Sequence, residues 1–260
     1  MLLIVLFILI GLTTGLLAGL LGIGGGVITV PALFFIFSFY HIQSTHLMHA
    51  CVATALATTL ITSLGSVWAH HKKQAILPSV LKITVPGLIV GCLLGVALSN
   101  VLSSKVLQLV FGLMMLCFSL YFFFPQLPQL NIAKRPNFSL ALFALLIGIL
   151  SSLLGIGGGI FMVPILLGYR VSLQNTVGSS SAGTLVTAGM GTIAYLLIAK
   201  GSSPLPHSIG FINIPAMLAI GISSICTTSL GCKLAHTLPQ DLTKKVFAVI
   251  VAITGIAMLF

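Results

Sequence analysis

Acidic residues are almost absent from this chain. Asp241 is the single carboxylate among 260 residues, against 11 lysines and arginines, and only 5% of the residues are charged. A soluble domain carries about 25% charged residues, so this composition excludes an ordinary soluble protein. Because the apolar segments contain no carboxylate, the chain cannot build an oxygen-rich metal site, paired-carboxylate catalysis or the acidic relay of many pumps. Cation transport loses support for the same reason.

Cysteines are few and follow no ligand pattern. Four of the five lie within apolar runs and the fifth ends one: Cys51, Cys92, Cys117, Cys226 and Cys232. Their spacings fit neither a metal site nor a disulfide framework, so we interpret them as small packing residues. We therefore expect no metal and no cofactor.

Hydrophobic residues make up 58% of the chain. Because a membrane-spanning helix needs about 20 apolar residues, this composition predicts an all-α protein integral to the lipid bilayer, without room for a soluble domain. The net charge of +10 is carried mostly by short loops, as membrane orientation requires, so we expect no nucleic-acid partner. The apolar segments are 2–20, 27–40, 46–69, 77–99, 105–124, 138–154, 160–169, 174–198, 212–232 and 243–260.

The stretch 125–137, PQLPQLNIAKRPN, divides the chain into two halves. It holds three prolines and two basic residues, and five apolar segments lie on each side of it. We predict a first membrane repeat over 1–124, a cytoplasmic linker over 125–137 and a second membrane repeat over 138–260. Because five is an odd number, the second half should enter the membrane from the opposite side, which gives two inverted repeats.

The stretch LLGIGGG occurs twice, at residues 20–26 and 153–159. Each copy is followed five residues later by a proline, Pro31 and Pro164, and the surrounding 19-residue windows agree at 12 positions. Such self-similarity indicates an internal duplication. The segment 160–169 is about 15 Å long as a helix, too short to cross a hydrocarbon core of about 30 Å. We therefore predict a broken or re-entrant helix pair at each glycine motif, with its turn facing the protein interior.

Glycine permits positive φ and close approach to the backbone, and free N–H groups at a helix N-terminus attract anions. The alternative is that these glycines only let membrane helices pack tightly. The exact repetition favours an anion site made of backbone N–H groups from two opposed sides. The candidate residues are Gly22, Gly24, Gly25 and Gly26 in the first copy and Gly155, Gly157, Gly158 and Gly159 in the second.

The paired sequences GLLAGLLGIGGGVITVPAL and GILSSLLGIGGGIFMVPIL resemble the two signature repeats of the TauE/SafE family of sulfite and organosulfonate exporters. The resemblance covers essentially the whole chain. It implies export of sulfite, sulfoacetate or a related small sulfur-containing anion. It does not select among these anions, and import stays open.

Basic residues test the topology. If every segment changes sides, or if each glycine motif forms a re-entrant hairpin, eight basic residues fall on one side and two on the other, as the positive-inside rule requires. A parallel-repeat topology gives five against five and is not favoured. Both termini should therefore lie outside. The eight residues are Lys72, Lys73, Lys134, Arg135, Arg170, Lys233, Lys244 and Lys245, and the two are Lys105 and Lys200.

Hydroxyl residues recur every four positions on the third segment of each half. Aligning the two segments places Thr54 on Ser180 and Thr58 on Thr184. Hydroxyls offer donors without charge, which suits the lining of an anion path, although serine and threonine in membrane helices also bond their own carbonyls. We predict that these four residues line the path. The full stripes are Thr54, Thr58 and Thr62, and Thr176, Ser180 and Thr184.

Three further polar residues lie within or beside apolar segments. His46 and His49 begin the third segment, and their titration range would allow proton coupling, although interfacial histidines are the simpler interpretation. Lys82 lies about two turns into its segment, where lysine usually extends its ammonium to the interface.

The sequence thus predicts a transporter of small anions in the plasma membrane, the inner membrane if the cell is a Gram-negative bacterium. The main alternative is a non-transporting scaffold or assembly subunit, whose glycine turns should be tightly packed and dry. An intramembrane enzyme is not expected, because no nucleophile–base pair is visible. The sequence gives neither the oligomeric state nor the coupling ion.

Overall fold

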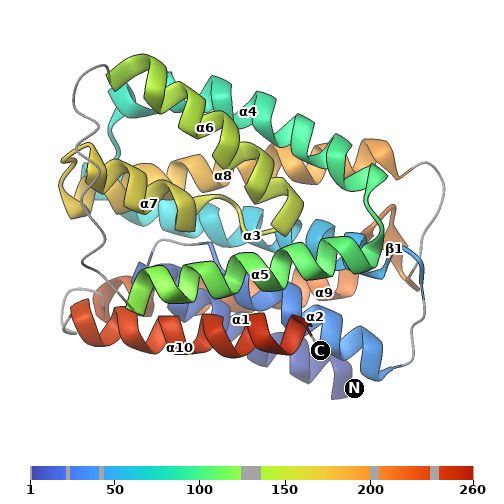
Figure 1. Cartoon of the computed structure of the whole chain (residues 1–260). Coiled ribbons are helices and arrows are strands. Elements are labelled where there is room, and N and C mark those ends of the chain that lie inside the picture. The colour runs from blue at the N-terminus through green and yellow to red at the C-terminus, as the bar shows by residue number, and fades with distance from the viewer. Residues whose placement is uncertain are drawn as a thin grey trace.

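The computed structural model describes residues 2–21, 24–40, 44–123, 136–199, 205–234 and 240–259. Helices dominate these ranges, as the composition predicts (Figure 1). The elements are α1 (Leu2–Leu21), α2 (Gly26–Phe39), α3 (Leu47–Lys72), α4 (Pro78–Val101), α5 (Ser104–Phe123), α6 (Pro136–Leu154), α7 (Gly159–Gly168), α8 (Leu173–Ile198), β1 (Ser208–Ile209), β2 (Ile212–Asn213), α9 (Ile214–Leu234) and α10 (Gln240–Leu259).

Each predicted apolar segment overlaps one helix. The antiparallel hairpin of β1 and β2 is not predicted by the sequence, because each strand has only two residues. In the described part of the chain, six helices are long and apolar enough to cross a membrane by length and composition. They are Leu2–Leu20, Leu47–Lys72, Pro78–Val101, Ser104–Phe123, Leu173–Ile198 and Ile214–Gly231.

The outer surface of the bundle is apolar. Large side chains such as Phe39, Val101 and Phe138 are 79%, 82% and 79% exposed. Soluble monomers rarely expose apolar patches of more than a few hundred Å², so a surface of this kind requires lipid around it. The chain is therefore a multi-pass membrane protein.

The two longest helices, α3 and α8, lie at the centre of the bundle. Each has 26 residues, and they contact one another as well as α9 and α4 respectively. Their sequences are rich in Ala, Gly, Ser and Thr, and small side chains let neighbouring helices approach closely. The polar residues of these helices are thereby buried inside the protein.

Two glycine-packed pairs flank this centre. In the pair α1–α9, a methyl group placed on Gly15 would lie 2.1 Å from the carbonyl oxygen of Ser224. In the pair α4–α6, a methyl group on Gly91 would lie 2.0 Å from the carbonyl oxygen of Leu145. Only glycine allows backbones to approach this closely. Each pair therefore joins one helix from each half of the chain.

Two helical hairpins enter the bundle from opposite ends (Figure 1). Helix α1 begins and α2 ends at one end, whereas α6 begins and α7 ends at the other. The chain breaks between α1 and α2, and between α6 and α7, at the two glycine motifs. The tips of both hairpins consequently lie inside the bundle, beside α3 and α8.

Candidate functional site

The glycine motifs adopt a backbone conformation that other residues rarely take. Gly24 and Gly25 have φ of +79° and +78°, and their counterparts Gly157 and Gly158 have φ of +79° and +85°. An L-residue with a side chain is strained in this left-handed region, by roughly 1–2 kcal/mol per residue. The motif therefore ends one helix and starts the next within a few residues. Gly22 lies outside the described residues.

The two motifs, 133 positions apart in the chain, touch one another. A methyl group placed on Gly26 would lie 2.2 Å from the carbonyl oxygen of Gly155, which itself has φ of +72°. Both turns are buried, including Gly159 at the start of α7. The duplicated sequence thus forms a single structural centre.

Two threonines pack against both glycine turns. A methyl group on Gly24 would lie 2.7 Å from Cγ2 of Thr184 and 3.0 Å from Cγ2 of Thr59. On Gly157 it would lie 2.7 Å from Cγ2 of Thr59 and 2.8 Å from Cγ2 of Thr184. Thr59 belongs to α3 and Thr184 to α8. Four elements therefore converge on one point, two glycine turns and two central helices.

Residues packed against the turns carry buried hydroxyls without a partner. Among the described residues, the buried hydroxyls that make no hydrogen bond are those of Thr59, Ser151 and Thr184. Ser151 contacts the second turn, because a methyl group on Gly158 would lie 2.8 Å from its Oγ. Buried polar atoms nearly always have a hydrogen-bond partner, so three unpartnered hydroxyls beside the same turns need an explanation.

Backbone donors surround the same centre. The amides of Gly26 and Val27 begin α2, and those of Gly159 and Ile160 begin α7; none takes part in the hydrogen bonds of the described residues. First-turn amides have no partner within their helix, and the helix dipole adds positive potential there. Two helix N-termini and three free hydroxyls thus supply donors without any charged side chain.

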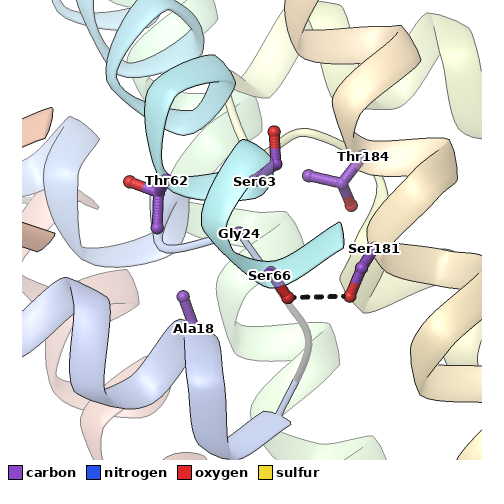
Figure 2. Close-up of a pocket in the computed structure, with 7 residues that line it drawn as sticks. All are labelled: Ala18, Gly24, Thr62, Ser63, Ser66, Ser181 and Thr184. Carbon is purple, nitrogen blue, oxygen red and sulfur yellow. Dashed lines mark hydrogen bonds between the residues drawn. The ribbon is translucent and has the colours of Figure 1, made fainter. Parts of the chain in front are cut away.

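A small cavity opens beside this centre (Figure 2). Toward one end it is bounded by Ser66 of α3 and Ser181 of α8, whose hydroxyls are hydrogen bonded at 3.1 Å. The space suits about one water molecule, so a larger anion does not fit in this conformation. The lining residues are Ala18, Gly24, Thr62, Ser63, Ser66, Ser181 and Thr184.

Of the hydroxyl stripes predicted from the sequence, Thr184 contacts the glycine turns and Thr62 lines the cavity beside them. The Thr58 hydroxyl donates to the carbonyl of Ala55 at 2.8 Å, and that of Ser180 donates to Val177 at 3.0 Å. Both bonds are of the local kind that serine and threonine commonly make in helices. The hydroxyl of Thr54 accepts from the amide of Asn213 at 3.0 Å.

Thr59 and Ser151 are not among the site residues predicted from the sequence. Thr59 follows Thr58 directly and therefore lies about 100° around the helix from the predicted stripe. A signal was present, since the adjacent pair Thr58 and Thr59 offers a hydroxyl on two neighbouring faces. In the described part of the chain, no group of three His, Cys, Asp or Glu residues is placed to hold a metal ion.

Comparison with known proteins identifies the family of the chain. The family model described as "Sulfite exporter TauE/SafE" matches residues 7–258. The chain belongs to the TauE/SafE family. This TauE/SafE protein is 30% identical to a "Probable membrane transporter protein" of Haemophilus influenzae, over 98% of this chain and 97% of the relative. No solved structure matches it.

Other relatives carry similar names. A "Probable membrane transporter protein" of Methanocaldococcus jannaschii is 28% identical over all of this chain and 96% of its own length. The protein YdhB of Bacillus subtilis, also named a probable membrane transporter, is 23% identical over 98% of this chain and 100% of its own length. The similarity to these relatives thus extends over whole chains.

Proposed function

We propose that this membrane transporter exports a small sulfur-containing anion such as sulfite or sulfoacetate. The anion is held near the membrane midplane between the two glycine turns, with Thr59 and Thr184 at its sides. The observation that carries this proposal is that three residues packed against the turns, Thr59, Thr184 and Ser151, bear buried hydroxyls without a partner. The family description names sulfite and export, which supports the choice of substrate class and direction.

The donor set suits an oxyanion. Sulfite and sulfonate groups present several acceptor oxygens on one small centre. The turns offer amides from opposed sides, and the threonines that contact them through Cγ2 carry unpartnered hydroxyls. A charged side chain would hold the anion tightly, because hydrogen bonds between two ions are the strong ones. All residues that line the cavity are neutral, which lets the anion leave again.

Transport requires a second conformation. The cavity now suits about one water molecule, so an anion enters only when α3, α8 or the turns move apart. Transporters built from inverted repeats place the substrate at the repeat interface and rock one part against the other. Helix α1 pairs with α9, and α6 pairs with α4. Each pair joins the first helix of one half of the chain to the fourth helix of the other half, and this symmetry supports such a repeat.

The ends of the bundle also support inverted repeats. The start of α1 and the end of α10 lie at one end, and the end of α5 and the start of α6 lie at the other (Figure 1). Basic residues at helix ends gather at the second end, with Lys72 closing α3 and Arg170 following α7. By the positive-inside rule this end is cytoplasmic, and both termini are outside.

A topology reporter tests this orientation. A reporter fused after Phe260 should report the outside, and one inserted at Lys134 should report the cytoplasm, because an odd number of crossings separates them. Alkaline phosphatase and green fluorescent protein fusions at both sites give complementary signals. The same compartment for both sites would contradict the inverted-repeat proposal.

Thr59→Val and Thr184→Val test the anion site. Valine keeps the shape and removes a hydroxyl that has no partner in this conformation. We expect anion transport to weaken by about tenfold or more per variant, since a hydrogen bond to a charged group contributes about 1.5–3 kcal/mol. The thermal stability should stay equal or rise, because an unsatisfied buried group is removed.

Thr58→Val is the matched control for these variants. Its hydroxyl bonds the carbonyl of Ala55, so its loss should leave transport nearly unchanged. Flux into proteoliposomes and the unfolding temperature in detergent are measured for all three variants and for the double variant. Unchanged flux in the Thr59→Val/Thr184→Val protein would return both residues to a packing role.

A further inference from the structure

A histidine pair lies away from the glycine turns, at the start of α3. This is the end of the bundle where α1 begins and α10 ends (Figure 1). His46 is exposed, whereas His49 is only 2% exposed, and their rings lie 5.3 Å apart between centroids. Phe211 covers both rings, at 5.6 Å from His46 and 5.9 Å from His49. The pair thus connects the surface to a buried imidazole.

The hydrogen bonds of His49 fix its tautomer. Its Nε2 lies 2.8 Å from the carbonyl oxygen of Ser99. A carbonyl oxygen only accepts, so Nε2 carries the hydrogen and the neutral ring keeps a lone pair on Nδ1. That Nδ1 is buried and has no hydrogen-bond partner in the described part of the protein. A buried basic nitrogen without a donor is a vacant site for a proton.

Among the described residues, no negatively charged side chain faces His49. His46 is the ionisable side chain that acts on it electrostatically, and α4 faces it with backbone groups of Ser99 and Leu102. From α8, the phenol of Tyr195 donates to the Ser99 hydroxyl at 2.9 Å and lies 3.2 Å from the carbonyl of Ser152. Phe211, next to β2, is apolar. A proton on His49 would therefore have no carboxylate to balance it.

We propose that Nδ1 of His49 binds a proton, delivered from the outer surface by His46, and that this proton and the transported anion favour one another. The inference rests on the proposed anion transport. Histidine is the side chain whose charge changes most readily between pH 5 and 8. Protonated His49 is a cation that needs a compensating anion. In the proposed mechanism the transported substrate supplies that negative charge.

The size of the effect follows from the spacing along α3. His49 and Thr59 are separated by ten residues, or about 15 Å of helix. Opposite unit charges at that distance, in a medium of intermediate dielectric constant, change binding by about fivefold. Coupling is reciprocal, so the anion strengthens proton binding by the same factor. The protein would then move protons together with its anion.

Flux measurements in proteoliposomes test the proposal. Sulfoacetate is the probe, since its sulfonate stays ionised throughout the range from pH 5.5 to 8. For the wild type we expect uptake to rise about fivefold as the pH falls, and an imposed sulfoacetate gradient to change the pH reported by a dye inside the vesicles. In His49→Gln the flux should persist without pH dependence and without proton movement, because the amide still donates to Ser99.

His71→Gln is the matched control, since His71 lies exposed at the opposite end of α3 and should keep both signals. Wild-type flux without proton movement would overturn the proposal even if His49→Gln fails to fold. Retained proton movement in a folded His49→Gln protein would also overturn it. A wild type without any sulfoacetate flux would instead refute the proposed anion transport, and this inference with it.

Discussion

Gly24→Ala and Gly157→Ala should each abolish anion transport while the protein still inserts into the membrane. Both residues have positive φ, and the added methyl group would lie 2.7 Å from a threonine Cγ2 at the point where the two turns meet. Real Cβ atoms do not approach so closely, so the turn or the threonines must shift. Insertion depends on total apolar length, which does not change. Anion flux and membrane abundance are measured together.

Serine substitutions at the threonines provide a rescue. Thr184→Ser removes the methyl group nearest to Gly24 and keeps the hydroxyl, so it should restore part of the flux of Gly24→Ala. Gly157→Ala meets both threonines, and its rescue should need Thr59→Ser as well. Rescue stays partial, because the left-handed backbone still costs roughly 1–2 kcal/mol with alanine.

The control for steric effects is Gly65→Ala, in α3. Its methyl group would lie 3.8 Å from Ile225, an ordinary contact, so flux should stay normal.

The neighbouring positions of the turns should follow the first prediction. Gly158→Ala meets Ser151 Oγ at 2.8 Å, whereas Gly25→Ala meets Thr14 at 3.2 Å, so the loss should be greater at Gly158. Normal flux in Gly24→Ala or Gly157→Ala would mean that the turn only packs.

A disulfide across the cavity should block transport reversibly. Ser66 and Ser181 face each other at 3.1 Å between their hydroxyls, on the side of the cavity toward the proposed cytoplasmic end. In Ser66→Cys/Ser181→Cys an oxidant should join α3 to α8 and reduce flux to background. A reductant should restore it, because separation of these helices admits the anion.

The cross-linking experiment needs a background without reactive thiols. Cys117 and Cys226 are exposed and are replaced by serine, as is Cys232, whereas Cys51 and Cys92 are buried. Single variants at Ser66 and Ser181 should keep their flux under oxidation. Full transport by the cross-linked protein would show that the anion takes another route.

The helices could be predicted from the sequence because their causes are local. The segment 77–99, with proline and apolar runs, corresponds to α4 over Pro78–Val101, and the glycine motifs correspond to the two breaks. Apolar length sets a membrane helix, and glycine or proline ends it. Gly25 and Gly158 have positive φ, a conformation that glycine adopts readily.

The composition of the site could be predicted only in part. The convergence of Thr59 and Thr184 on Gly24 and Gly157 depends on how α3 and α8 cross, which is a long-range contact. Period-four spacing selected Thr58, whose hydroxyl bonds its own helix. A regular stripe identifies a polar face, but hydroxyls satisfied within the helix cannot be told from free ones without tertiary structure.

The pairing of α1 with α9 has a consequence for biosynthesis. Helix α1 is synthesised well before its partner, because it packs, through Gly15, against α9, which begins only at Ile214. At 5–20 residues per second, α1 waits roughly 10–40 s for its partner. Its glycine face is meanwhile open to other small-residue helices. An insertase or chaperone that shields α1 during synthesis would therefore determine how much nascent chain reaches the native bundle.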